Sequence, residues 1–369
     1  MDAIHLGKID SDAGVTVSRK DKVDGSFKKW EKFSAEANID TYLRNFDEFQ
    51  KFEVFSGFAY RIRHNFAGTT SRDELRGSTV RADVFNVSQA FQQNGYDDPI
   101  RTRDGRLSRL LSRQFKAYIE LDPPPNQQSP LPISIFRDIK DLAITARQKA
   151  EAQLIRGSLF FGHRSCEYTK TPKSEEKKTR LLELQDIRFY DSRKKEVKHA
   201  HIKARASELE FVAIRYRNQK NGEVNEVVVQ RRNHTDLCPV VEWRDLAIRI
   251  WSYPGTHVRT TVNTFFDTKK QRFYDIESKH VLAHLRRVVQ HRGAKLLGIP
   301  IKSVGTHSVR ISFAMLMHLN GSNDSTIMKM GRWKSAAFLA YIRSYVDQFG
   351  GDSSIIIVKD NGDFITLRK

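Results

Sequence analysis

The sequence predicts a mainly α-helical protein with one small antiparallel β-sheet, an α+β fold, in two domains. Apolar residues recur at helical spacing in both halves of the chain. Two strand-like segments flank Asn221-Gly222, a dipeptide typical of tight hairpin turns. A proline-rich stretch over 123–132 lies between the two helical regions and is expected to be an extended linker. With 369 residues, the chain is long enough to form two hydrophobic cores.

The N-terminal half is expected to contain an arm and a helical domain. Residues 1–35 are polar and basic and lack periodicity, which is typical of a mobile basic arm. Residues 36–122 are expected to form a helical domain, with helices beginning from Ile39 onward. The apolar positions that would face its core are Tyr42, Phe46 and Phe49, then Val80, Val84, Val87 and Phe91, then Leu107, Leu110, Leu111, Phe115 and Tyr118.

Basic residues follow one face of the third of these predicted helices. They are Arg106, Arg109, Arg113 and Lys116, with no acidic residue interleaved. A stripe of this kind is suited to contacts with DNA phosphates. A solvated helix surface is the equally ordinary alternative.

The C-terminal half is expected to hold a catalytic domain over 133–350. A helix is predicted from 133 to about 159. Strands are predicted at 184–190, 209–217 and 224–231, the last two joined at Asn221-Gly222. Helices should return from 278 to about 346, broken at 298–300 and at 321. A tail over 351–369 repeats the hairpin pattern around Asn361-Gly362.

Composition narrows the class of partner. Lys and Arg number 63 against 44 acidic residues, a formal net charge of +19. This excess favours a polyanion, most simply double-stranded DNA, over an acidic membrane surface or charge kept for solubility. The two cysteines, Cys166 and Cys238, lack the spacing of a disulfide framework or zinc ribbon. No spanning segment or signal peptide is apparent, so we expect no membrane partner and an intracellular location: the nucleus in a eukaryotic host, otherwise the cytoplasm or nucleoid.

Six side chains could together cleave a phosphodiester without a metal. Such chemistry requires cations at the non-bridging oxygens, a nucleophile, and an acid for the leaving oxygen. Singly, each candidate has an ordinary structural explanation: an Arg164–Glu167 ion pair, a solvated turn lysine, a surface His-x-x-Arg pair, or a core aromatic. The candidates, in chain order, are Arg164, Lys220, His307, Arg310, Trp333 and Tyr341, with Glu167 in a supporting role.

The order of these residues resembles the active-site signature of the tyrosine recombinases, the phage integrase-like family. The wording of Arg-Ser-Cys-Glu-Tyr at 164–168, Gln-Lys-Asn at 219–221, and Gly-Arg-Trp-Lys-Ser with Tyr-Ile-Arg at 331–343 looks most like recombinases of Crypton-like and DIRS-like mobile elements. The resemblance covers most of the chain from Ile39 to about Tyr345. Two departures stand out: Trp333 occupies a position where many members have histidine, and Tyr341 follows it by one residue fewer than in many members.

The resemblance implies a helical DNA-binding domain, a catalytic domain and a site-specific recombinase or integrase activity. Tyr341 would form a 3′-phosphotyrosyl intermediate, without metal, ATP or any cofactor. Arg164 and Arg310 would clamp the phosphate with His307 and Trp333, and Lys220 would be the general acid. Four protomers on two duplexes are implied. A type IB topoisomerase-like enzyme and a catalytically silent DNA-binding descendant of a mobile element are the alternatives, whereas a metal nuclease lacks a carboxylate cluster.

Overall fold

The computed structural model describes residues 14–15, 17–64, 74–123, 128–171, 179–219, 222–335 and 338–339. By their internal contacts, the residues divide into two compact units, Met1–Pro125 and Asn126–Lys369. Each unit has its own hydrophobic core. Among the helices of the described ranges, none is long and apolar enough to cross a membrane.

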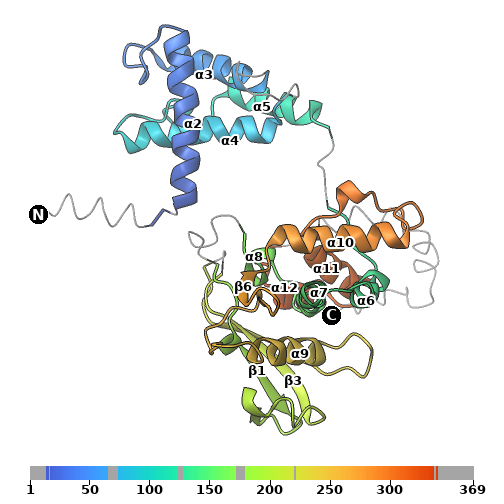
Figure 1. Cartoon of the computed structure of the whole chain (residues 1–369). Coiled ribbons are helices and arrows are strands. Elements are labelled where there is room, and N and C mark those ends of the chain that lie inside the picture. Colours follow the sequence, from blue (N-terminus) through green and yellow to red (C-terminus); the bar gives the residue numbers. More distant parts are fainter. Residues whose placement is uncertain are drawn as a thin grey trace, which may run out of the picture. The chain divides into compact units, whose positions relative to one another are not determined.

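The described residues of the first unit form four helices, shown in blue to cyan-green in Figure 1. Their core consists mainly of aromatic and β-branched side chains, including those expected of the second helix, Val80 to Phe91. Ser108 begins the last helix by accepting a hydrogen bond from the Leu111 backbone N–H. The helices are α2 (Val17–Glu36), α3 (Glu48–Arg63), α4 (Gly77–Gln93) and α5 (Arg109–Leu121).

The expected mobile arm is wrong for its second half, because α2 is an ordered part of the first core. Trp30 on α2 is fully buried and stacks on Phe55 with ring centroids 4.5 Å apart. Its indole N–H donates to the carbonyl of Thr41 at 2.8 Å. Val23 is also buried, and Phe27 and Phe33 pack against the same core, so one apolar face anchors a helix whose other residues are mostly polar. Residues 1–13 lie outside the described residues.

The helix expected from Ile39 begins later, at Glu48. Asp47 caps α3 by accepting a hydrogen bond from the backbone N–H of Gln50 at 2.8 Å. The residues before it form turns. Phe49 is therefore on the outer face, with 63% of its surface exposed, and does not join the core.

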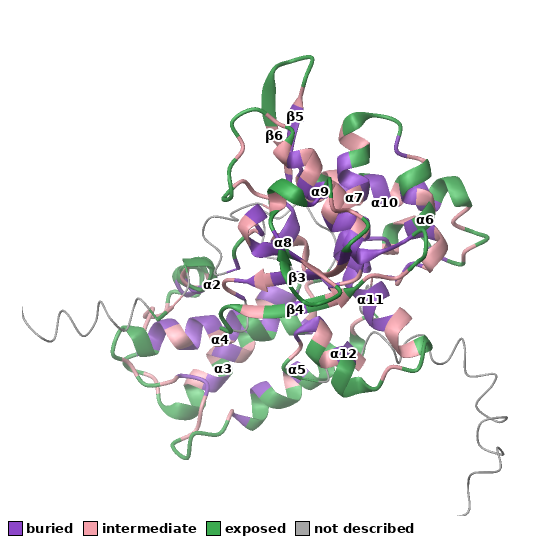
Figure 2. Ribbon diagram, turned by 90° about the horizontal axis from the view of Figure 1, so that it is seen from below, coloured by how far each residue is buried: buried purple, intermediate pink, exposed green. Residues whose placement is uncertain are grey.

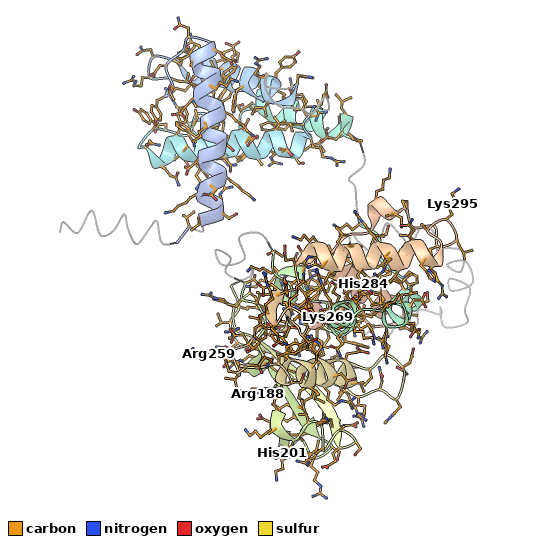
Figure 3. The ribbon with its side chains drawn as sticks, in the orientation of Figure 1. Arg188, His201, Arg259, Lys269, His284 and Lys295 are labelled. Atoms are coloured by element: carbon orange, nitrogen blue, oxygen red, sulfur yellow. The ribbon has the colours of Figure 1, made fainter. Side chains whose placement is uncertain are left out.

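The described residues of the second unit are mainly helical, with one four-stranded sheet and a separate two-stranded hairpin (Figure 1). Instead of one helix over 133–159 there are two, because Thr145 caps a new helix at Ala146. The helices are α6 (Ile133–Asp141), α7 (Ala146–Leu159), the single turn α8 (Ser165–Tyr168), α9 (Pro239–Trp251), α10 (Ser278–Arg292), α11 (Ser308–Leu319) and α12 (Asp324–Gly331). His284 of α10, labelled in Figure 3, has its Nδ1 3.0 Å from Glu151 Oε2 of α7, a contact that joins these two helices.

The sheet has the order β2-β1-β3-β4 with antiparallel neighbours throughout. Its strands are β1 (Ile187–Asp191), β2 (Glu196–Val197), β3 (Leu209–Tyr216) and β4 (Glu226–Arg231). The pairing of β3 with β4 confirms the predicted hairpin. A separate hairpin of β5 (Thr264–Asp267) and β6 (Arg272–Asp275) was not predicted.

Helix α11 runs through the core of the second unit. Every residue from Ser308 to Met315 is buried, and Figure 2 shows this part of the helix largely in the buried colour. Burying a charged side chain costs free energy unless it is hydrogen-bonded, so an arginine on this part of the helix needs acceptor groups from neighbouring segments. The predicted tail hairpin at 355–367 lies outside the described residues.

Candidate active site

The segment Gly331-Arg332-Trp333 ends α12 with a sharp reversal of the backbone. Arg332 has φ 59° and ψ 46°, the left-handed conformation that often ends a helix but is unusual for a side chain other than glycine. Gly331 has no room for a larger residue, since a Cβ there would lie 1.7 Å from the Trp333 ring. This glycine therefore lets the indole fold back against the helix end.

Arg310 projects from α11 onto this reversal. Its guanidinium donates to the carbonyl oxygen of Gly331 at 2.6 Å and to that of Gly162. The Trp333 ring lies 4.1 Å from the guanidinium carbon, a cation–π contact. Arg310 is 1% exposed, and burial together with the nearby charge of Arg164 lowers its pKa to about 9.

Gly162 presents its carbonyl to Arg310 because only glycine fits there. Its φ is +52°, and an added Cβ would lie 2.7 Å from the ring of Phe313 on α11. The chain can then turn sharply between α7 and α8 while its backbone touches α11. The apolar segment Phe160-Phe161-Gly162 thus delivers the next residues, including Arg164, to the same place as Arg310.

Arg164 and Glu167 form the ion pair expected from their spacing. The distance between Arg164 Nη1 and Glu167 Oε1 is 3.0 Å, and the Arg164 backbone N–H donates to Glu167 Oε2 at 2.8 Å. The Arg164 side chain is 19% exposed, whereas that of Glu167 is 1% exposed. Arg164 also donates to the carbonyl oxygen of Arg332 at 3.4 Å. Arg164 is therefore the guanidinium of this group that reaches the surface.

Arg332 is a third arginine of the site, which the motif analysis did not select. Its guanidinium makes two hydrogen bonds to the Glu167 carboxylate, at 3.0 and 2.8 Å, and one to Gln219 Oε1 at 3.2 Å. It lies over the Tyr216 ring, 3.6 Å from the centroid. The one sequence feature that could have pointed to Arg332 is its position between Gly331 and Trp333. Position alone is not specific, because most arginines lie on protein surfaces.

Arg164, Arg310 and Arg332 together form an arginine cluster. Arg164 and Arg332 bond the one carboxylate of Glu167, and Arg310 bonds the carbonyl oxygens of Gly162 and Gly331. Burial alone would raise the pKa of Glu167, but Arg332 and Arg164 hold it well below the usual range. Burial likewise opposes the charge on Arg332, and the Glu167 carboxylate raises its pKa above the usual value. Three guanidinium groups around one carboxylate leave an excess of positive charge.

Two aromatic side chains, His163 and Tyr216, pack against the arginine cluster. His163 is fully buried, and its Nε2 lies 2.7 Å from the Tyr216 hydroxyl. Burial lowers the pKa of His163 to about 3, with the Arg332 charge acting in the same direction. Burial also raises the pKa of Tyr216. Both rings are thus neutral near pH 7 and add no negative charge to the cluster.

His307 lies at the N-cap of α11, one turn before Arg310. It is half-buried, and its backbone N–H donates to Gln128 Oε1 at 2.9 Å. A Cβ on Gly305 would meet Gln128 Cδ at 2.0 Å, so glycine is required for this contact. The middle of the predicted linker is thereby attached to the loop that carries His307.

Two of the six predicted residues, Lys220 and Tyr341, lie outside the described residues. The other four fall into one region, since Arg164, Arg310 and Trp333 are joined by the contacts above and His307 is one turn from Arg310. Next to Lys220, Gln219 is buried and bonded to Arg332.

The predicted basic stripe of the first unit is exposed. Arg106, Arg109, Arg113 and Lys116 are all at the surface, on α5 and the residue positions before it. No acidic residue is interleaved in the stripe, but its two end residues pair with acids that flank it. Arg106 lies 3.2 Å from Asp104, and Lys116 lies 3.8 Å from Glu120.

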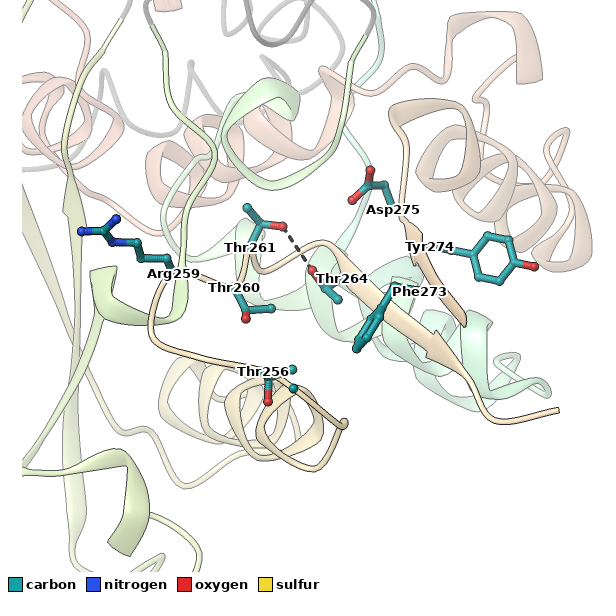
Figure 4. Close-up of a pocket in the computed structure, with 9 residues that line it drawn as sticks. Thr256, Arg259, Thr260, Thr261, Thr264, Phe273, Tyr274 and Asp275 are labelled. Carbon is teal, nitrogen blue, oxygen red and sulfur yellow. Dashed lines mark hydrogen bonds between the residues drawn. The ribbon is translucent and has the colours of Figure 1, made fainter. Parts of the chain in front are cut away.

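A separate hollow of about 360 Å³ lies beside the β5–β6 hairpin (Figure 4). Its lining includes four threonines, two of which, Thr261 and Thr264, share a hydrogen bond of 3.1 Å. Arg259 and Phe273 complete part of its wall. None of the predicted site residues lines it, so the hollow is distinct from the arginine cluster.

No protein-family profile matches the chain, and no curated protein matches it in sequence. A solved structure of lambda integrase (75–356), a dimer bound to a COC′ core site, has a TM-score of 0.50 at 12% identity, over 91% of this chain and 92% of that chain. XerH site-specific recombinase bound to palindromic difH substrate has a TM-score of 0.47 at 14% identity, over 87% and 75%. The Tn1549 transposon integrase with circular intermediate DNA has 0.44 at 14%, over 79% and 80%. The likeness to lambda integrase confirms the predicted fold class.

Proposed function

We propose that the protein is a tyrosine recombinase that cuts and rejoins double-stranded DNA through a 3′-phosphotyrosyl intermediate, without metal or ATP. The arginine cluster is the observation that carries this proposal. Two of its guanidinium groups, Arg164 and Arg332, share the carboxylate of Glu167, and the third, Arg310, bonds backbone carbonyl oxygens beneath the Trp333 ring. A site with excess positive charge and forked donors suits a phosphodiester. The fold shared with lambda integrase supports the same conclusion.

The proposed reaction is a transfer of the phosphoryl group between two oxygens. The Tyr341 phenol loses its proton and its oxygen attacks phosphorus, while the bond from phosphorus to the 5′ oxygen breaks. The 5′ oxygen leaves as a hydroxyl after it takes a proton from Lys220. Attack by a 5′-hydroxyl of the same or another strand reverses these steps, so no outside energy source is needed.

Each described residue has a definite part in this scheme. Arg164 is the partly exposed guanidinium of the cluster and would meet a non-bridging oxygen first. Arg310 is buried in this structure, so its contact with phosphate requires the groups above it to separate when DNA binds. His307, at the start of α11, would assist removal of the phenol proton, since an imidazole accepts protons near neutral pH.

The first unit and the assembly complete the proposal. The exposed cations of α5, Arg109 and Arg113 among them, would contact DNA phosphates outside the cleavage site. Four protomers on two duplexes would exchange strands. The motif wording supports an origin among Crypton-like or DIRS-like mobile-element recombinases.

Trapping of the covalent intermediate tests the proposal. The protein is incubated in EDTA with a pool of nicked duplexes whose sequence around the nick is randomised. Cleavage next to a nick releases a short 5′-hydroxyl fragment that diffuses away, which prevents rejoining. We expect a denaturation-resistant protein–DNA adduct carried through the 3′ phosphate. A chelation-sensitive cut with no adduct would contradict the proposal and favour a metal nuclease.

A further inference from the structure

Arg332 is the residue at which three separate segments meet. Its side chain binds Glu167 of α8 and Gln219 after β3, and its own backbone ends α12. Two consecutive carbonyl oxygens at this point accept hydrogen bonds from the other arginines of the cluster. The Gly331 carbonyl oxygen accepts from the Arg310 guanidinium at 2.6 Å, and the Arg332 carbonyl oxygen accepts from the Arg164 guanidinium at 3.4 Å. The direction of both guanidinium groups thus depends on the backbone of one turn.

That turn is held in its unusual conformation by the Arg332 side chain. Residues other than glycine avoid φ near +59° unless tertiary contacts compensate. Here the side chain is 0% exposed and has a carboxylate, an amide and an aromatic face as partners. A planar fork can satisfy all of these at once, whereas an ammonium group cannot.

We propose that Arg332 is a positioning residue for the strand-cleavage reaction, a role that rests on the function proposed above. It fixes the turn whose carbonyls aim Arg164 and Arg310, and it orders the Glu167 carboxylate that Arg164 also uses. Being fully buried beneath Glu167, it does not itself touch the phosphate.

Single-turnover cleavage by Arg332→Lys tests this role. The charge stays, but the fork that fixes the turn is lost, so DNA affinity should be close to that of the wild type while the cleavage rate falls about 100-fold. The matched control is Arg156→Lys. Arg156 is also buried, on α7, and pairs with Glu242 at 2.6 Å, yet it has no part in the arginine cluster. It should lose stability without losing cleavage once folded.

A second substrate separates positioning from a general structural defect. In a methylphosphonate duplex, a methyl group replaces one charged non-bridging oxygen, so less negative charge has to be met by the arginines. The deficit of Arg332→Lys should then shrink to below about 10-fold, because misaimed guanidinium groups matter less. An unchanged deficit on both substrates, or an equal loss in Arg156→Lys, would overturn the role.

The double variant Glu167→Gln with Arg332→Gln covers the case in which Arg332→Lys does not fold. It leaves no buried unpaired charge at these two positions, so it should melt at a higher temperature than Arg332→Gln alone. It should still cleave slowly, because the turn is no longer fixed. If the double variant cleaves within about threefold of the wild-type rate, the positioning role of Arg332 is wrong, but the proposed function stands. Absence of an adduct with the wild type would instead defeat the proposed function, and the inference with it.

Discussion

The carbonyl oxygen of Gly331 accepts a 2.6 Å hydrogen bond from the guanidinium of Arg310. The two residues belong to different helices, α11 and α12, and this bond sets the direction of a buried charge. Because the Trp333 ring occupies the space of a Gly331 side chain, ring and carbonyl are placed together. We therefore expect the geometry of the arginine cluster to change when a single methyl group is added at Gly331.

Gly331→Ala should lower the cleavage rate by about 100-fold, since the new Cβ, 1.7 Å from the ring, must displace Trp333 and the carbonyl. The free energy of unfolding should fall by about 1 to 3 kcal/mol. Single-turnover cleavage and thermal melting measure the two effects. Gly25→Ala is the control, because no atom lies within 4 Å of a Cβ there. Cleavage at the wild-type rate by Gly331→Ala would show that the ring is free to shift.

Lys220→Ala should slow cleavage by about 100-fold if Lys220 protonates the leaving oxygen. A substrate with sulfur at the bridging 5′ position needs no proton on its leaving group and should restore most of the rate. Arg164→Lys should be defective on both substrates, because a point charge does not reproduce the forked contact. Lack of recovery by Lys220→Ala on the sulfur substrate would assign this lysine to DNA binding only.

DNA affinity should fall steeply with salt, with a log–log slope of about −0.9 for each phosphate contact. The double change Arg109→Gln with Arg113→Gln should make the slope shallower by about 1.8. Arg44→Gln is the control, because this exposed arginine already pairs with Asp40 at 2.9 Å. Binding titrations at several salt concentrations give the slopes. An unchanged slope in the double variant would exclude these side chains from the DNA interface.

Acid should destabilise the second unit through His163. The unfolded chain binds a proton at this residue below its ordinary pKa of 6.5, whereas the folded chain binds it only near pH 3, because burial lowers the pKa. The free energy of unfolding should therefore fall as pH drops across this window, by up to about 1.4 kcal/mol per pH unit from this group. Denaturant unfolding at several pH values measures the slope. His163→Gln should reduce it, and an identical slope would refute the assignment.

The sequence predicted the elements whose own residues carry a strong pattern. Val80, Val84, Val87 and Phe91 recur at helical spacing, and they are buried on α4. The β3–β4 hairpin follows from local turn chemistry. Helix α2 was missed because most of its residues are polar and its burial depends on Trp30 packing against another helix.

The sequence predicted those site residues that can be recognised by their functional groups. Arg164, His307, Arg310 and Trp333 have functional groups that suit phosphate transfer. Arg332 was not chosen, because its importance comes from burial and from partners 165 and 113 positions away, Glu167 and Gln219. Gly162 was likewise not chosen, since its contact with Phe313 exists only in the folded chain.

Peptide mapping of the trapped adduct tests the central claim most directly. Tyr341 and Tyr345 are four residues apart, so on a helix either phenol could approach the same phosphate. DNA joined through its 3′ phosphate to Tyr341 is the predicted result, with Tyr345→Phe still forming the adduct and Tyr341→Phe binding DNA without forming one. An adduct on Tyr345, or one that persists in Tyr341→Phe, would contradict the assignment of the nucleophile.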